Sequence, residues 1–558
     1  MTTLDDPYAA DVPWRVSGLL AGVEGLSAAD VHVARHLGGI GGEDDERVLL
    51  AAALAVQALR GGSVCVVLDE TPEVHAAIRR SPLVADGPDG PADRPLRWVD
   101  GRVYLDRYWR DEQVVRSAVH ERLAHPAPAD PAALSAAIDR LYPSAADDAQ
   151  REALRTAATS YLTVLTGGPG TGKTTTVARL VAALQAAAGP GLRVALAAPT
   201  GKAAARLQES VNAEVAQLDD AIGTLRATTV HRLLGWRPGT TTRFRHDRLR
   251  CLPHDVVIVD ESSMVSLSLM ARLVEALRPT ARLVLVGDPD QLASVEAGAV
   301  LGDLVAALPG GVVRLTEAHR YGPSLAELAE AIRQGDADTT LALLRSGDEH
   351  RSWVEPADDR LSPQDVAGLR ADVEASGRAL LDAARAGDAA AALQALGTHR
   401  LLVAHREGPF GLEQWAATAE TWTGATAGPW PLGRPLLVTE NDRASGLFNG
   451  DTGVVISDGL GGVVVAFGEP DDPRLVRPYR LPAVQPVHAM TVHRGQGSQF
   501  ARVTLLLPPA DAPLLTRELL YTAVTRAREH VRVIGTEEAV RAAVERPVRR
   551  ASGLREPR

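Results

Sequence analysis

Only two lysines occur among the 59 basic residues of this chain, Lys173 and Lys202, and a glycine directly precedes each. Lys173 completes a run that matches the phosphate-binding loop G-x-x-x-x-G-K-[ST]. In such a loop, backbone N–H groups surround the phosphates, and a compact ammonium fits where a planar guanidinium is crowded out. The sequence therefore predicts that the chain binds a nucleoside triphosphate. The residues expected to contact it are Gly167, Gly168, Pro169, Gly170, Thr171, Gly172, Lys173, Thr174 and Thr175.

Two adjacent carboxylates, Asp260 and Glu261, follow the apolar run Val256–Val259. In a phosphate-loop enzyme the first carboxylate holds Mg²⁺ together with the loop hydroxyl, here that of Thr174. The second carboxylate polarises an attacking water. ATP and Mg²⁺ are therefore the predicted cofactors, and a glutamate directly after the aspartate indicates hydrolysis.

Three further residues complete the predicted catalytic set. Gln291 follows the apolar run 283–286, where its amide can contact the γ-phosphate or the attacking water. Arg320 and Arg526 each follow a short segment of apolar character, and an arginine that faces a triphosphate stabilises charge in the transition state. Two such arginines from elsewhere in the chain would make hydrolysis depend on closure of a cleft between lobes. Taken singly, Gln291 also suits an ordinary turn, and each arginine suits an exposed helix start.

Composition restricts the classes of protein to consider. The 558 residues are enough for three or four domains, and 45% hydrophobic with 23% charged residues is typical of a globular protein. Two cysteines exclude a disulfide framework and a cysteine-rich zinc site, which fits a protein of the reducing cytoplasm. We find no apolar run long enough to span a membrane, and expect no membrane partner. A net charge of −11 excludes a protein that coats nucleic acid with its whole surface, but not a local basic channel.

The order of apolar runs indicates an α/β protein in three parts. A Pro/Ala-rich stretch near residue 125 ends an N-terminal domain, 1–125, which we expect to be mainly helical. Strands alternate with helices in a first lobe, 135–335, with a small insertion at 213–253, and in a second lobe, 336–558. Short β-rich runs divided by Asn-Gly and Gly-Gly turns predict a small SH3-like β-barrel inserted at 440–486. The tail from Arg546 is expected to be disordered. Strands are predicted at 162–166, 192–198, 256–259, 283–286, 400–404, 503–507 and 531–534, and a helix at 174–188.

Read in order, the segments resemble the motif series of superfamily 1 helicases of the RecD family, a subunit of exodeoxyribonuclease V. The matching segments are Asp147-Asp-Ala-Gln150, the phosphate loop, Ala198-Pro-Thr-Gly-Lys202, Thr229-Val-His-Arg, Ile258-Val-Asp-Glu, Val286-Gly-Asp-Pro-Asp-Gln-Leu292, Glu317-Ala-His-Arg320, Ala489-Met-Thr-Val-His-Arg-Gly-Gln-Gly-Ser-Gln499 and Tyr521-Thr-Ala-Val-Thr-Arg526. The resemblance implies two RecA-like lobes with ATP between them, and ATP-driven stepping along single-stranded DNA in the 5′→3′ direction. It also implies that Gln150 reads the adenine.

The resemblance further implies which side chains face the DNA strand. Small hydroxyls, a cation and imidazoles hold phosphate and sugar without reading sequence. Each hydroxyl or histidine taken alone is better explained as a helix cap or a satisfied turn residue. The chain departs from the family pattern at Gln499, where a carboxylate is usual, so a role for that acid in coupling ATP to DNA is in doubt. The implied DNA-facing residues are Thr200, Lys202, Thr229, His231, Thr491 and His493.

The N-terminal region distinguishes among relatives. It resembles the small domain by which RecD docks onto RecB and RecC, which predicts a heterotrimer with RecB-like and RecC-like subunits acting on single-stranded and duplex DNA in double-strand-break repair. Standalone relatives carry helix-hairpin-helix repeats instead, and we expect the one candidate, Gly39-Ile40-Gly41, to be a loop before a helix. Two alternatives stay open: a standalone repair or conjugative helicase, and an ATP-switched interaction or loader protein that does not unwind processively. We find no nuclease constellation in the sequence.

Overall fold

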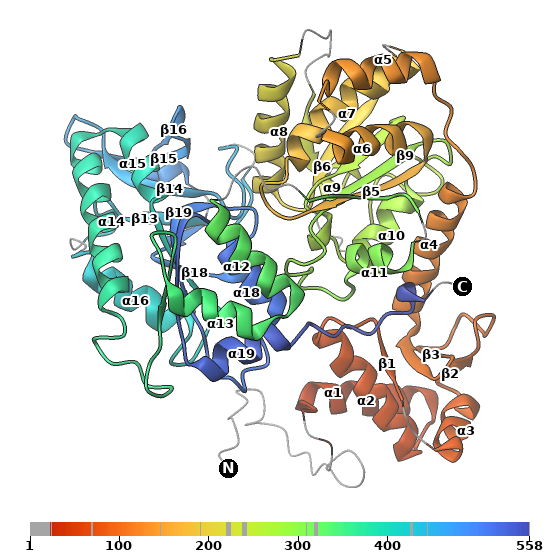
Figure 1. Ribbon diagram of the computed structural model, residues 1–558. Helices are drawn as coiled ribbons and strands as arrows, with labels where there is room; N and C mark the ends of the chain where they lie inside the picture. Colours follow the sequence, from red (N-terminus) through yellow and green to blue (C-terminus); the bar gives the residue numbers. More distant parts are fainter. Residues whose placement is uncertain are drawn as a thin grey trace.

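The computed structural model describes residues 23, 25–68, 71–144, 147–189, 191–218, 225–236, 243–308, 310–316, 322–424, 428–442, 445–481 and 483–556. It contains three parts built around separate sheets (Figure 1). Among these residues, no helix has the length and apolar character needed to cross a bilayer.

The N-terminal module packs three helices against a small sheet with the strand order β1-β4-β3-β2. A fourth helix follows the sheet and buries Val115 and Val119 in the core of the first lobe. The predicted loop at Gly39-Ile40-Gly41 is wrong, because these residues form the last turn of α1 and Gly42 ends the helix in the left-handed conformation. The module consists of α1 (Ala28–Gly41), α2 (Glu46–Arg60), β1 (Cys65–Val67), α3 (Pro72–Arg80), β2 (Val84–Asp86), β3 (Leu96–Val99), β4 (Arg102–Leu105) and α4 (Asp106–Leu123).

The first lobe is a parallel sheet of order β10-β5-β9-β8-β6-β7 with helices on both faces. Its central strands are buried on both sides, which explains their continuous Val, Leu and Ile runs. All four strands and the helix predicted here are confirmed to within two residues. The elements are α5 (Pro131–Leu141), α6 (Asp148–Thr159), β5 (Leu162–Gly167), α7 (Lys173–Ala188), β6 (Val194–Ala198), α8 (Gly201–Val215), β7 (Ala227–Thr229), α9 (Val230–Leu233), β8 (Val256–Val259), η3 (Ser262–Met264), α10 (Leu267–Glu275), β9 (Arg282–Gly287), α11 (Val300–Ala307) and β10 (Val312–Leu315).

The second lobe is another parallel sheet, of order β11-β20-β19-β12-β18. Helix α12 precedes the sheet in sequence, and Leu325, Leu328 and Ile332 from it join the second lobe's core. The elements are α12 (Pro323–Gln334), α13 (Ala337–Ser346), β11 (Arg351–Val354), α14 (Ala367–Ala386), α15 (Ala389–Leu396), β12 (His399–Val403), α16 (Leu412–Trp422), β18 (Ala489–Thr491), α17 (Val492–Gly495), β19 (Phe500–Leu506), α18 (Arg517–Val524), β20 (Ala527–Ile534) and α19 (Glu537–Glu545).

A five-stranded antiparallel sheet interrupts the second lobe between α16 and β18, in the order β16-β15-β14-β13-β17. One face packs on α14 and α15 of the same lobe. The loop before β14 reaches the first lobe, since a Cβ added to Gly201 would lie 2.6 Å from the Phe448 side chain. The insertion consists of β13 (Pro435–Val438), β14 (Thr452–Ser457), β15 (Val463–Glu469), β16 (Asp472–Val476), η4 (Pro478–Arg480) and β17 (Val484–Pro486).

Residues 547–556, which we call the C-terminal strap, cross from α19 to the other two parts, and the prediction of a disordered tail is wrong (Figure 1). Ala551 accepts a backbone hydrogen bond from Val64 at 2.8 Å, beside strand β1. Gly553 donates its N–H to Glu112 of α4 at 2.9 Å, and Leu554 is buried. The sequence of the strap is polar and Arg-rich, so its order comes from these distant partners and not from its own hydrophobicity.

Candidate active site

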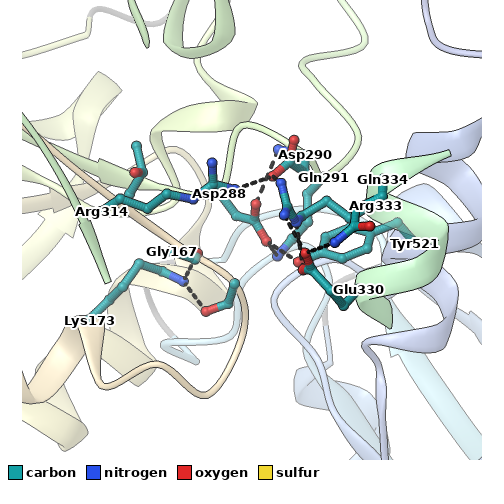
Figure 2. A network of polar contacts seen from close by, with 12 residues as sticks. Gly167, Lys173, Asp288, Asp290, Gln291, Arg314, Glu330, Arg333, Gln334 and Tyr521 are labelled. Atoms are coloured by element: carbon teal, nitrogen blue, oxygen red, sulfur yellow. Dashed lines mark hydrogen bonds and ion pairs between the residues drawn. The ribbon is translucent and has the colours of Figure 1, made fainter. Parts of the chain in front are cut away.

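The phosphate loop joins the end of β5 to the start of α7, so the amino-terminal end of a long helix faces the loop's interior. Gly172 has φ +79°, a conformation open to glycine, and directly precedes Lys173. The Lys173 Nζ donates to the carbonyl oxygens of Gly167 and Gly168 at 2.6 and 2.8 Å (Figure 2). The ammonium is thus held at the loop's centre, where a phosphate would replace the two carbonyls.

The two carboxylates stand at the carboxyl end of β8, in the middle of the same sheet edge. Glu261 has φ +49°, which is unusual for a residue with a side chain and costs about 1 kcal/mol. Burial and the neighbouring Glu261 carboxylate together raise the pKa of Asp260 to about 6. Two acids held this close in a strained turn are typical of a functional site, because the arrangement does little to stabilise the fold.

A cleft between the lobes brings most of the predicted catalytic residues together. Lys173, Thr174, Asp260, Glu261 and Gln291 line it from the first lobe, and Arg526 lines it from the second. The lining also contains Pro169, Gly170, Gly172, Ala203, Arg206, Leu207, Ser210, Gly497 and Gln499.

Several predicted residues are not part of this lining. Four of them belong to the phosphate loop and the first turn of α7, namely Gly167, Gly168, Thr171 and Thr175. Gln150 lies buried in the first turn of α6, outside the cleft as formed by the described residues. Arg320 lies outside the described residues.

Arg526 is fixed before any nucleotide contact. It follows α18 directly, is 3% exposed, and its Nε donates to the Thr522 carbonyl at 3.0 Å. A second guanidinium nitrogen donates to the Thr525 hydroxyl at 3.2 Å. Its orientation toward the cleft is therefore set by the end of its own helix, so movement of the second lobe carries the charge with it.

Sequence reasoning missed one cation of the cleft, Arg206 on α8. Its guanidinium donates to the Gly497 carbonyl of the second lobe, and it lies within electrostatic range of Glu261 and Arg526. Burial lowers its pKa. The helical register places Arg206 one turn beyond Lys202, which is the only sequence signal that could have found it.

The three threonines expected to face DNA all cap helices. Thr200, Thr229 and Thr491 each precede a helix at the carboxyl end of a strand, and each hydroxyl accepts a backbone N–H three residues later, at 3.2, 3.1 and 3.3 Å. The capping alternative is therefore confirmed for all three. Each turn also points the helix's first N–H groups out of the sheet edge, which is where a phosphate binds well.

The histidines and Lys202 differ in their surroundings. Burial lowers the pKa of His231 and of His493, and the charge of Arg550 lowers that of His493 further. Burial also lowers the pKa of Lys202 to about 8, despite the nearby carboxylate of Asp451 in the insertion. Both imidazoles are therefore neutral near pH 7, while Lys202 keeps most of its charge.

Comparison with known proteins places this site in a family. Three family profiles match: the AAA domain over residues 145–354, the UvrD-like helicase C-terminal domain over 486–534, and the RecBCD enzyme subunit RecD N-terminal domain over 23–75. The RecBCD enzyme subunit RecD of Mycolicibacterium smegmatis is 50% identical over 97% of this chain and 99% of its own length. The chain belongs to the RecD family. As a RecD-family protein it is an ATP-dependent DNA helicase, which confirms the resemblance found in the sequence.

Other relatives match to different extents. RecD of Mycobacterium tuberculosis H37Rv is also 50% identical, over 95% of this chain and 94% of its own length. The ATP-dependent RecD2 DNA helicase of Deinococcus radiodurans is 34% identical over 79% of this chain, but over only 56% of its own length. Among solved structures, Bacteroides Pif1 bound to single-stranded DNA has 17% identity and a TM-score of 0.39, over 69% of this chain and 91% of that one.

Proposed function

We propose that this RecD-family chain is a 5′→3′ DNA helicase that translocates on single-stranded DNA as the alpha subunit of a RecBCD-type helicase/nuclease in recombinational double-strand-break repair. The observation that carries the proposal is the cleft that Lys173, Glu261 and Gln291 line from one lobe and Arg526 lines from the other. Groups that hydrolyse ATP are split between two bodies, so hydrolysis and relative movement of the lobes depend on each other.

Each residue of the cleft receives a role. Lys173 and the loop N–H groups bind the phosphates, Glu261 accepts a proton from the attacking water, and Gln291 orients that water. Arg526, with Arg320 as its predicted companion, neutralises charge that develops on the γ-phosphate. We keep Gln150 as the proposed adenine contact, on the strength of the family resemblance alone.

The chemistry of the donor set fits Mg²⁺. The Thr174 hydroxyl and the Asp260 carboxylate line one cleft, and oxygen ligands of this kind suit a small divalent ion. Burial first, and then the neighbouring Glu261 carboxylate, raise the pKa of Asp260 despite the charge of Lys173, and a divalent cation would offset both effects. Bound there, Mg²⁺ would neutralise phosphate charge, while Thr174 and Asp260 would hold it.

DNA is proposed to cross the carboxyl ends of both sheets. Thr200, Thr229 and Thr491 begin helices at that edge, with Lys202, His231 and His493 beside them. Neutral imidazoles and helix N-termini bind phosphate irrespective of sequence, as translocation requires. We propose that the antiparallel sheet of the insertion is an SH3-like barrel beside this path, and that the protein works in the cytoplasm, associated with the nucleoid.

The subunit assignment rests on similarity to RecD subunits. The two RecD relatives above are 50% identical over 95% or more of this chain. The chain also matches the RecD N-terminal domain profile at 23–75. We therefore propose RecB-like and RecC-like partners bound through residues 1–125, with the two lobes at 135–335 and 336–558.

ATPase measurements with and without single-stranded DNA test the motor. The Lys173→Ala variant is expected to lose DNA-stimulated hydrolysis by more than about 100-fold, whereas Arg370→Ala, at an exposed arginine of α14, is expected to keep it. Normal turnover by Lys173→Ala would contradict the proposal, and tight ATP binding without unwinding would favour the switch alternative. Gel filtration after co-expression tests the subunit role: a heterotrimer supports it, and a lone active monomer opposes it.

A further inference from the structure

The Tyr521 hydroxyl reaches from the second lobe into the first. Tyr521 lies on α18 and is 4% exposed, and its Oη donates to the Oδ2 of Asp288, which follows β9, at 3.2 Å (Figure 2). The same hydroxyl lies beside the phosphate loop, because a Cβ added to Gly168 would be 3.1 Å from it. One phenol oxygen from the moving lobe thus stands between two elements of the nucleotide site.

Asp288 in turn holds Gln291. Its Oδ2 accepts the Gln291 Nε2 at 2.9 Å, and its Oδ1 accepts the backbone N–H of Asp290 at 3.1 Å. A carboxylate accepts hydrogen bonds and donates none, so the amide NH₂ of Gln291 must face Asp288. The Gln291 carbonyl oxygen is then the group left to accept a hydrogen bond from a water in the cleft.

The same helix end carries Arg526. Thr522, next to Tyr521, accepts the Leu292 N–H on its hydroxyl at 2.9 Å, and Gln496 of the second lobe donates to the Leu292 carbonyl at 2.7 Å. The segment that contains Gln291 is therefore hydrogen-bonded to the second lobe through both backbone groups of Leu292. When α18 moves, the Tyr521 hydroxyl and the Arg526 guanidinium move together.

We propose that Tyr521 is a positioning residue for ATP hydrolysis. Its hydroxyl donates a hydrogen bond to Asp288, and Asp288 then orients the Gln291 amide toward the attacking water. This bond forms only when α18 has brought Arg526 into the cleft. This inference rests on the proposed function and refines it. Without the hydroxyl, Asp288 is a buried carboxylate with one donor fewer, so the group that orients the Gln291 amide is itself held less firmly. Binding of ATP to the phosphate loop does not use this bond.

The test is Tyr521→Phe, which removes one oxygen and keeps the ring in the core. In the full chain with single-stranded DNA, kcat for ATP is expected to fall about 10-fold while KM for ATP stays within about twofold. Tyr479→Phe, at a tyrosine 85% exposed on the insertion, is the matched control and is expected to behave as wild type. An unchanged kcat, or an effect confined to KM, would overturn the proposal.

A double-mutant comparison separates positioning from loss of structure. If Tyr521 acts through Gln291, the Tyr521→Phe/Gln291→Ala double variant is no slower than Gln291→Ala alone. Independent, multiplying losses would overturn the inference but leave the proposed function standing. Should Tyr521→Phe fail to fold, Asp288→Asn must show the same fall in kcat at constant KM, or the inference is wrong. If Lys173→Ala lost ATP turnover while Gln291→Ala kept the wild-type rate, both the role of Gln291 and this inference would be wrong.

Discussion

The two lobes each contain the tetrapeptide Thr-Val-His-Arg, at 229–232 and at 491–494, and comparison of the two turns separates local from tertiary effects. Both threonines have nearly the same backbone, with φ −73° and −71° and ψ 150° in each, and both cap a four-residue helix. Their histidines nevertheless meet different neighbours. His231 is the more exposed of the two, and its ring centroid lies 6.0 Å from that of Phe244, while His493 is more deeply buried beside Arg550.

The difference teaches that local sequence sets the backbone of each DNA-facing turn, whereas the surroundings set its electrostatics. At the first turn the carboxylate of Glu296 partly offsets the effect of burial on the pKa of His231. At the second turn Arg550, which belongs to the C-terminal strap, adds to the effect of burial on His493. Because the two turns have the same backbone, we expect each to place a DNA phosphate in the same way. Because their histidines have different charged neighbours, we expect DNA binding at the two turns to depend differently on pH.

The largest expected effect concerns the strap that makes the second turn different. Burial raises the pKa of Glu112, which accepts the Gly553 N–H, to about 7 from an ordinary value of 4.5. The folded state therefore holds the proton more tightly than the unfolded state. This contribution to the free energy of unfolding is fully present below pH 4.5 and is lost as the pH rises through 7. Glu112→Gln is expected to remove this loss and to raise the free energy of unfolding at pH 8 by about 3 kcal/mol relative to wild type.

Urea unfolding of both proteins at pH 5 and pH 8 measures the gain. Asp130→Asn, at an exposed helix cap, serves as a control for a general loss of one negative charge. If the free energy of unfolding of Glu112→Gln differed from that of wild type by the same amount at pH 5 and pH 8, Glu112 would not titrate between these pH values.

The next effect concerns Lys202, a residue of the first lobe that has no counterpart in the second lobe, which contains no lysine. Lys202→Ala is expected to weaken binding of single-stranded DNA about 10-fold at low salt and to reduce the salt slope by about 1. Because burial lowers its pKa to about 8, wild-type affinity falls as the pH rises through 8, while Lys202→Arg keeps its affinity. Fluorescence anisotropy with a single-stranded oligonucleotide at pH 7 and pH 9 measures these affinities. If the affinity of Lys202→Arg also fell between these pH values, Lys202 would not be the titrating group.

A smaller effect compares the caps themselves. Thr491 is buried and Thr229 is partly exposed, so Thr491→Ala is expected to lower the free energy of unfolding by about 1 kcal/mol and Thr229→Ala by about half of that. Serine at either position keeps the hydroxyl and is expected to restore most of the loss. Thermal denaturation of the four variants tests this, and alanine variants as stable as their serine counterparts would rule out the capping role.

The smallest effect concerns the two histidines. Both are neutral at pH 7, so replacing either with glutamine is expected to change DNA affinity about two- to threefold. On acidification His231 becomes a cation before His493, because Arg550 opposes protonation of His493. Both pKa values lie below the ordinary value of 6.5, so the measurement runs from pH 7 to pH 5. Affinity of the His493→Gln variant should rise over this range about as much as that of wild type, and affinity of His231→Gln should rise less. Equal curves for the two variants would refute the difference between the turns.

Much of the site could be predicted because its signals are local. The phosphate loop, the strand before Asp260, and the segment with Gln291 each combine a buried strand with a polar end, and the structure places them at one sheet edge. Capping by the three threonines was an open alternative for the same reason, since a cap depends on residues three apart.

What could not be predicted depends on distant contacts. Arg206 faces the cleft because α8 packs so that its side chain meets Gly497 of the other lobe. The strap is ordered because Glu112, 441 positions away, accepts the Gly553 N–H. The helical register places Arg206 on the same face as Lys202 but does not show that this face meets the other lobe. The strap contact leaves no periodic pattern at all, so the ordered tail could not be inferred from the sequence.

The most direct test of the central claim, an ATP-driven motor whose two lobes share one nucleotide site and move 5′→3′ on DNA, is unwinding of 5′-tailed and 3′-tailed duplexes with Mg²⁺ and ATP. The wild-type chain, alone or with its partner subunits, is expected to open the 5′-tailed duplex, and substitution of Lys173→Ala in the same preparation is expected to stop this chain's contribution. Tailed substrates with the partner's own ATP site inactivated isolate that contribution. Opening of the 3′-tailed duplex by this chain, or opening of the 5′-tailed duplex at the wild-type rate by Lys173→Ala, would contradict the account.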